Sequence, residues 1–299
     1  MDSLNLDDVI SSDPTWKRAH ELVNTYLPIT TQTWQLVKAS WYGEADLTRY
    51  VRTISFSYLD PKCLLVAAEM NNPAEFEPNV ETLQQAIKFL GMKFSAVVLS
   101  VDVVCRMTLK TNPPSFWHKL FKDLITSVHI GYLFGAKCRE LGLEAGAIMG
   151  FARYAGLVLL LASDHEKYRQ LINSKNANKQ LELFGCQDYQ VTAIALQKLG
   201  YGTDVALGAA LGIGKIAAKH NSYSREVLTW KNTVNWIEAL EQGKPYPEIR
   251  TANRFFPELV PAGDNAKNLN LDALHADIKP LLANGSNWMW HVARGGYSA

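Results

Sequence analysis

The chain has 299 residues, which is enough for one large domain or two ordinary ones. Apolar residues make up 47% of the chain and charged residues 20%, a composition typical of folded globular proteins that excludes an intrinsically disordered chain. The 30 basic and 29 acidic residues leave a formal net charge of +1. This balance excludes a strongly basic nucleic-acid-binding body, so we expect no DNA binding.

The termini and the cysteines favour a cytoplasmic location. The first 13 residues carry four aspartates and no lysine or arginine, which is the wrong chemistry for a signal peptide. The four cysteines are widely spaced and form no C-x-x-C pair, as in proteins of a reducing compartment. The most apolar stretch, residues 145–162, has Arg153 at its centre, so we interpret it as a buried helix and expect no membrane span.

Helical periodicity dominates the first half of the chain. Asp60-Pro61 is typical of a helix start, and apolar residues at intervals of three and four predict a helix to about Asn71. A second helix is predicted from residues 80–82 to Gly91, where glycine favours a helix end. A third is predicted over residues 93–107.

Two prolines within residues 111–114 predict a linker and a subdomain boundary, because proline cannot continue a helix. The pattern then predicts a series of helices in the second half, at residues 116–141, 144–162, 163–172, 179–184, 188–199, 203–219 and 222–240. No alternating run bounded by hairpin turns is present, so the fold class we predict is all-α.

The last sixty residues change in character. Four prolines and a glycine within about twenty residues predict an irregular connection over residues 242–268. A helix is predicted over residues 269–282, interrupted near Pro280, and Trp288 and Trp290 suggest that the C-terminal segment docks on the body. The predicted domain organisation is therefore an N-terminal extension (1–24), a main domain with two lobes (25–110 and 115–240 within 25–240), and a linker with a docked C-terminal segment (241–299).

Several of these motifs together resemble one family. Residues 82–91, T-L-Q-Q-A-I-K-F-L-G, are similar to the block S-L-x-x-A-I-x-x-L-G of the HDOD family, with Ala86 and Gly91 at matching positions. The segment from Asp60-Pro61 to Asn71 resembles that family's D-P … A-N-S helix, although Met70 and Asn72 depart from it. The HDOD family comprises signalling relatives of the HD-type metal phosphohydrolases.

The resemblance continues into the second half of the chain. Phe116-Trp117 resembles the F-W that opens the family's second half, and Gly150 to Gly156 falls on its G-L-L-H-D-I-G. Gly185 falls on the glycine of its G-x-x-H, with Asp188 at the histidine. The resemblance implies an all-helical fold with a helical N-terminal lobe and a degenerate HD-like lobe, and a regulatory role in bacteria.

The residues at the HD metal-binding positions cannot form the site of an active hydrolase. Where the resemblance places the His-Asp dipeptide, this chain has Arg153-Tyr154, and a guanidinium has no lone pair for a metal. Lys119 and Asp188 stand at two further histidine positions. We therefore expect no catalytic residue, no metal ligand and no cofactor, and we interpret these positions as a vestigial site.

Arg153 is the only charged residue between residues 145 and 162. Since a lone buried guanidinium is unfavourable, we hypothesise that its fixed charge replaces the metal ion and is paired with a carboxylate from a neighbouring helix. Asp188 is the first candidate for that carboxylate and Asp123 the second. The alternative is that Arg153 extends to solvent along its aliphatic stem.

Three functions remain open from the sequence. The leading hypothesis is a non-catalytic signalling module that binds a protein partner or a small ligand. The alternative is a metal-dependent phosphohydrolase of the HD superfamily acting on nucleotides or cyclic dinucleotides. The third is a non-catalytic binder of a nucleotide second messenger. It is favoured by basic residues near the long helix: Lys110, Lys119, Lys122, Lys137 and Arg139. The sequence identifies neither the partner nor the oligomeric state.

Overall fold

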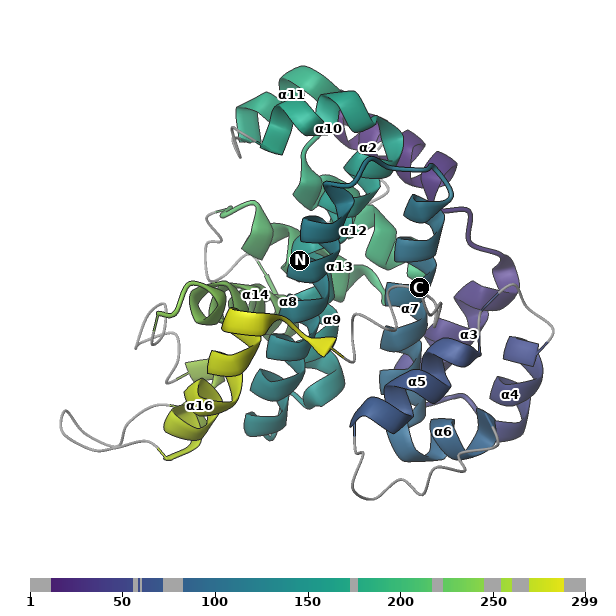
Figure 1. Cartoon of the computed structure of the whole chain (residues 1–299), viewed down its shortest axis with the longest axis vertical. Helices are drawn as coiled ribbons and strands as arrows, with labels where there is room; N and C mark the ends of the chain where they lie inside the picture. The colour runs from purple at the N-terminus through teal and green to yellow at the C-terminus, as the bar shows by residue number, and fades with distance from the viewer. Residues whose placement is uncertain are drawn as a thin grey trace.

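The computed structural model describes residues 12–55, 59, 61–71, 83–172, 177–216, 223–244, 254–259 and 269–287. Helices account for the regular structure in these ranges, and none of their residues is in a β-strand. The all-α prediction is confirmed. Figure 1 shows two long central helices, α8 and α9, with shorter helices arranged around them.

In the first half of the chain, α3, α5 and α6 pack against α7. Asp13 caps α2 by accepting a hydrogen bond of 2.8 Å from the Thr15 amide, and Pro14 occupies the first helical turn, where its missing N–H is not needed. Gly91 separates α6 from α7 with a φ of +76°, a conformation that glycine adopts without strain. The helices are α2 (Pro14–Tyr26), α3 (Thr31–Trp41), α4 (Leu47–Ser55), α5 (Lys62–Asn71), α6 (Leu83–Leu90) and α7 (Met92–Leu109).

The second half follows the short connection at residues 111–114. Its elements are α8 (Trp117–Lys137), α9 (Leu143–Ser163), α10 (His165–Ile172), α11 (Ala177–Phe184), α12 (Asp188–Leu199), α13 (Thr203–Ile213), α14 (Arg225–Glu241), the 3-10 turn η1 (Pro257–Leu259) and α16 (Leu269–Asn284). Most helices lie where the periodicity predicts them, since the same apolar pattern that identifies a helix also buries it.

Three features of the helices depart most from the prediction. The α8 helix ends at Lys137, four residues early, because the chain turns at once into α9 through Gly142, which has a φ of +84°. The α13 helix ends at Ile213, because Lys215, just after the C-cap residue Gly214, leaves the helical conformation with a φ of +52°. The α16 helix is not interrupted at Pro280. Proline lies there on the exposed side, while Leu274 and Ile278 stay buried on the other face.

The centre of the fold is the pair α8 and α9. The apolar stretch predicted as a buried helix is α9, which is long and apolar enough to cross a membrane but is mostly buried inside the fold. A Cβ at Gly146 on α9 would overlap the carbonyl oxygen of Gly131 on α8, so the two backbones lie in direct contact. Close backbone approach of this kind requires glycine and leaves no room for an inserted side chain.

The first helix of the described chain, α2, packs on the second half of the protein. Its residues Trp16, Ala19 and Leu22 are buried, and the helix contacts α12 and α9. The predicted limit between residues 24 and 25 falls inside this helix, so residues 14–24 are part of the packed body. The α7 helix also packs along α9, which joins the two predicted lobes beyond the short linker between them. The division into lobes remains a prediction.

The C-terminal helix α16 lies beside α8, as Figure 1 shows in yellow. Leu271, Leu274 and Ile278 are buried on its inner face. Beyond the helix, the Ser286 hydroxyl forms a hydrogen bond of 2.9 Å with the His129 ring on α8. Trp288 and Trp290, which suggested docking, lie outside the described residues.

Candidate functional site

A cavity of about 360 Å³ opens between α8, α9, α10 and α12. The five residues that the sequence assigned to the vestigial site all line it: Lys119, Asp123, Arg153, Tyr154 and Asp188. They come from three helices that are separate in the sequence, so the tertiary fold brings them together. The rest of the lining consists of apolar and aromatic side chains, mainly of α8, α9 and α10, and of the polar side chains of Gln180 and Glu238.

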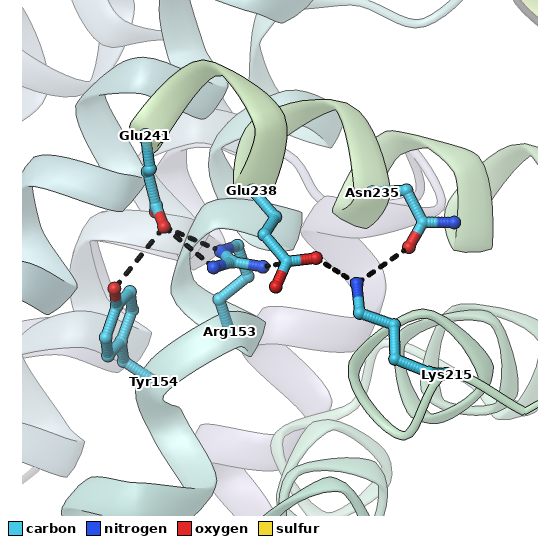
Figure 2. A network of polar contacts seen from close by, with 6 residues as sticks. All are labelled: Arg153, Tyr154, Lys215, Asn235, Glu238 and Glu241. Carbon is cyan, nitrogen blue, oxygen red and sulfur yellow. Dashed lines mark hydrogen bonds and ion pairs between the residues drawn. The ribbon is translucent and has the colours of Figure 1, made fainter. Parts of the chain in front are cut away.

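Arg153, which lines this cavity, is bound by the carboxylate of Glu241, as Figure 2 shows. Its Nη2 and Nε atoms donate to Glu241 Oε2 at 2.7 and 3.1 Å, and the hydroxyl of Tyr154 donates to the same oxygen at 3.3 Å. Glu238 lies 3.9 Å from Arg153 Nη1 and also pairs with Lys215. Lys215 in turn donates to Asn235 at 3.2 Å. The result is a continuous polar chain between α9, α14 and the end of α13.

The partner of Arg153 is thus Glu241, and not Asp188 or Asp123 as predicted. Only 13% of the Arg153 side chain and 14% of the Glu241 side chain are exposed, which also argues against the alternative that Arg153 extends to solvent. The reason lies in the packing, because α14 lies against α9 and its C-terminal turn brings Glu241 to the Arg153 guanidinium.

Asp188 forms hydrogen bonds at the start of α12 instead of an ion pair with Arg153. Its carboxylate accepts a hydrogen bond of 2.8 Å from the Tyr189 amide, and its own amide donates to Gln180 Oε1 at 2.7 Å. Burial raises the pKa of Asp188, against the opposing effects of these hydrogen bonds and of the charge of Arg153. The carboxyl is therefore held in the cavity wall at an electrostatic cost.

The sequence contained a signal for Glu241. Glu238 and Glu241 both fall in the last turn of α14, which carries no basic residue. Carboxylates at a helix C-terminus oppose the helix dipole, so a pair of them there indicates a cation from another element. The predicted helix stopped at Leu240, one residue short of the carboxylate that matters.

The pair also determines the protonation of the two α9 residues. Burial alone would lower the pKa of Arg153, but the adjacent Glu241 carboxylate more than offsets this and raises it. Burial, reinforced by the same carboxylate, raises the pKa of Tyr154, so its phenol stays protonated and donates a hydrogen bond. Neither side chain is available as a general base or as a metal ligand.

Gly156 allows α12 to approach the cavity. A Cβ at this position would overlap the carbonyl oxygen of Asp188. The Thr192 hydroxyl accepts from the Gly156 amide at 3.0 Å and donates to the Ala152 carbonyl at 3.1 Å. This contact fixes the first turns of α12 against α9, and so places Asp188 in the same cavity wall as Arg153.

The basic residues near the long helix do not form a single cluster. Lys119 and Lys137 lie at opposite ends of α8, about 27 Å apart along the helix axis. Lys137 lies 3.9 Å from Asp277 on α16, whereas Lys119 and Lys122 line a second hollow beside the end of α16. Only Lys119 reaches the cavity of the candidate site.

Comparison with known proteins identifies solved structures that share this architecture. Neither the known family models nor the curated proteins provide a match. An HDOD domain protein of unknown function from Geobacter sulfurreducens, solved by crystallography, superposes with a TM-score of 0.63 at 10% identity, over 94% of this chain and 98% of that one. The chain has the HDOD fold. A protein from Marinobacter aquaeolei VT8, assigned provisionally to signal transduction, superposes with a TM-score of 0.63 at 14% identity, over 98% of this chain and 67% of that one.

The HDOD motif positions of the first half have structural roles. Ala86 is fully buried on α6, and Gly91 makes the left-handed turn into α7. Asn71 is the last residue of α5. Ala86 and Gly91 thus shape the packing and the turns of the first half, and neither lines the cavity.

In the second half, Trp117 opens α8, where its ring packs edge-on against Phe121 at 4.9 Å. Gly150 brings α9 against the Ser127 carbonyl of α8, and Gly185 ends α11 with a φ of +74°. Among the glycines of these HDOD motifs, Gly156 is the one packed against a residue of the cavity lining, Asp188.

The HD metal ion does not fit the residues at this site. Arg153 and Tyr154 replace the two ligands of the dipeptide, and both are hydrogen-bonded to Glu241. In the part of the chain that the structure describes, no three His, Cys, Asp or Glu residues lie close enough together to hold a metal. A guanidinium carries a fixed positive charge and offers no lone pair to a metal ion.

Proposed function

We propose that this chain is a non-catalytic signal-transduction module of the bacterial cytoplasm that acts by binding a protein partner, without contact to DNA or to a membrane. The observation that carries the proposal is the Arg153 and Tyr154 pair bound to Glu241 at the position of the HD dipeptide. A site whose cation is part of the protein has no open coordination position to activate water.

The fold supports a role in signalling. Of the two solved structures compared above, one is provisionally assigned to signal transduction, and the other is an HDOD domain protein of unknown function. Fold alone does not assign a function, so the argument against catalysis depends on the side chains of the site.

The shape of the site supports a binding role. The lining of the cavity combines apolar and aromatic side chains with several charged and polar groups, a mixture that ligand-binding and partner-binding clefts use for affinity and for orientation. Ile172 lies at its rim with 40% of its surface exposed. A large apolar side chain exposed beside a cleft is a suitable contact for a partner.

An activity assay tests the absence of catalysis. The full chain is incubated with Mg²⁺, Mn²⁺ or Fe²⁺ and either bis(p-nitrophenyl) phosphate or a cyclic dinucleotide. We expect hydrolysis no faster than with the metal ion alone. Metal-dependent turnover that is lost in both Asp123→Asn and Asp188→Asn would establish the phosphohydrolase alternative at this cavity.

Site-specific crosslinking tests partner binding. A photoreactive amino acid replaces Ile172 in the full chain, expressed in its native cell, and the matched control replaces Phe89, which is similarly exposed at 38% but lies on α6. We expect a discrete crosslinked protein from position 172 and not from position 89. No crosslink at position 172, or the same product from both positions, would contradict partner binding at this face.

A further inference from the structure

A second and larger hollow, of about 560 Å³, lies on another face of the protein. It is bounded by α2, α3 and the turn between α12 and α13. It shares no lining residue with the cavity around Arg153. We call it the α2–α3 groove, and its volume falls within the range of small-molecule binding sites, about 300 to 1,000 Å³.

The charges that line this groove have one sign. Lys38 from α3 and Lys198 from α12 both face it, and the lining includes His20 but no aspartate or glutamate. Asp204, the nearest acidic residue along the α13 sequence, is not part of the lining. Within the described chain, neither lysine forms an ion pair with a carboxylate.

Lys198 is only partly solvated. Its Nζ atom donates to the neutral side chain of Asn24 at 2.6 Å, and burial lowers its pKa. A partly desolvated ammonium that is matched only by an amide gains more from an incoming anion than a fully hydrated lysine would. The groove therefore favours a negatively charged ligand.

Aromatic surface lies beside these charges. Lys38 Nζ is 4.6 Å from the centre of the Trp34 ring, and 53% of the Tyr42 surface is exposed. Gln197 and Thr203, 3.3 Å apart, add neutral hydrogen-bonding groups to the wall. The groove thus combines cations, flat apolar rings and polar groups in a single hollow.

We propose that the α2–α3 groove is a nucleotide-binding site, in which Lys38 and Lys198 contact the phosphates and the base packs on Trp34 or Tyr42. Lysine binds phosphate as a point charge, and aromatic rings stack on any base. The absence of carboxylates from the lining removes the repulsion that a polyanion would otherwise meet. The inference goes beyond the proposed function, because it concerns a different surface and holds whether or not the Arg153 cavity binds a protein.

Calorimetric titration of the full chain with ADP, adenosine and inorganic phosphate tests the site. We expect ADP to bind most tightly, because only ADP engages both the lysines and the rings, and we expect its affinity to fall as salt is added. Lys38→Met and Lys198→Met should each weaken ADP binding by about tenfold, and should weaken phosphate binding as well. Trp34→Leu with Tyr42→Leu should weaken ADP binding and leave phosphate binding unchanged.

Matched controls separate binding from folding. Lys88→Met removes an exposed lysine on α6, outside the lining, and should not change the affinity for ADP. Thermal melting compares each variant with the parent, and Lys38→Gln and Lys198→Gln replace any methionine variant that melts early.

Three results would overturn the proposal. The first is no heat of binding with ADP at millimolar concentration, and the second is equal ADP affinity in the parent and in both lysine variants. The third is a short single-stranded oligonucleotide that binds more tightly than ADP through the same lysines, since it would indicate a nucleic-acid surface. If Lys119→Met were the only variant to lose ADP binding, the Lys38 and Lys198 variants would bind ADP as the parent does, which is the second result. The site would then lie in the Arg153 cavity.

Discussion

The two hollows of this protein differ in whether their positively charged side chains are paired with carboxylates. In one, Arg153 is mostly buried and is held by Glu241, with Glu238 close by. In the other, Lys38 and Lys198 face an open groove whose described lining contains no carboxylate. A buried cation requires a counter-charge from the fold itself, whereas a cation at the edge of a groove is solvated by water until an anion binds. The difference indicates that the first charge is structural and the second is available to a ligand.

The largest effect should follow from breaking the buried pair. Arg153→Met leaves the Glu241 carboxylate buried without its cation, and we expect it to lower the free energy of unfolding by about 3 kcal/mol, measured by urea denaturation. The double variant Arg153→Met with Glu241→Leu should recover most of that loss, because both charges are then absent. A single variant as stable as the parent would show that the pair is not structural.

A smaller loss should follow at the helix contact that supports the same cavity. Gly156→Ala places a methyl group against the Asp188 carbonyl, and a backbone atom cannot move aside as a side chain can. We expect a loss of about 2 kcal/mol in the free energy of unfolding. The sign is diagnostic, since glycine to alanine in an uncrowded helix would stabilise the protein by up to about 1 kcal/mol.

Replacing Gly202, a glycine in the lining of the α2–α3 groove, should lower the free energy of unfolding less than replacing Gly156. Gly202 has a φ of +86°, and a Cβ there would meet the Tyr42 hydroxyl, which is the mobile end of a side chain. We expect Gly202→Ala to lower the free energy of unfolding by about 1 kcal/mol, mostly through backbone strain. Gly243→Ala is the matched control, because Gly243 also has a positive φ, +67°, but nothing lies within 4 Å of its Cβ position. A loss at position 202 far above that at position 243 would show that Tyr42 is held rigidly.

The smallest effect should be a gain in stability. Burial raises the pKa of Asp188, so folding disfavours its ionised form. The stability that the neutral carboxyl retains at low pH is lost as the pH rises through the raised pKa of the folded state. Asp188→Asn, which can still accept the Tyr189 amide, should therefore be more stable than the parent at pH 7 and lose this advantage in acid. Destabilisation by Asp188→Asn at pH 7 would instead make Asp188 a counter-ion of Arg153.

Local patterns in the sequence predicted much of the fold. The helix over residues 188–199 was predicted with its observed bounds, because an apolar face, a capping segment and a terminal glycine all act within a few residues. The predicted ends of α8 and α13 were wrong, and so was the predicted interruption of α16 near Pro280. Each depends on packing against another helix or on a backbone turn that the composition of the segment does not determine.

The candidate site was predictable only in part. The resemblance to a family indicated which positions would meet, and the structure places Lys119, Asp123, Arg153, Tyr154 and Asp188 around one cavity. It did not indicate the partner of Arg153, because Glu241 lies 88 residues away and outside the motifs. The α2–α3 groove carried no motif, since its lysines and aromatic rings come from helices whose sequences are ordinary taken singly.

The sequence by itself therefore determined the fold class, most of the helices and the chemical character of the residues around the Arg153 cavity. These properties depend on side-chain type and on spacings of three or four residues, which are local. The tertiary structure alone decided which carboxylate holds Arg153 and which lysines remain without one. Pairing between distant charges depends on how α9, α12 and α14 pack, and that arrangement is set by close contacts such as the one at Gly156, where a single methyl group would keep two helices apart.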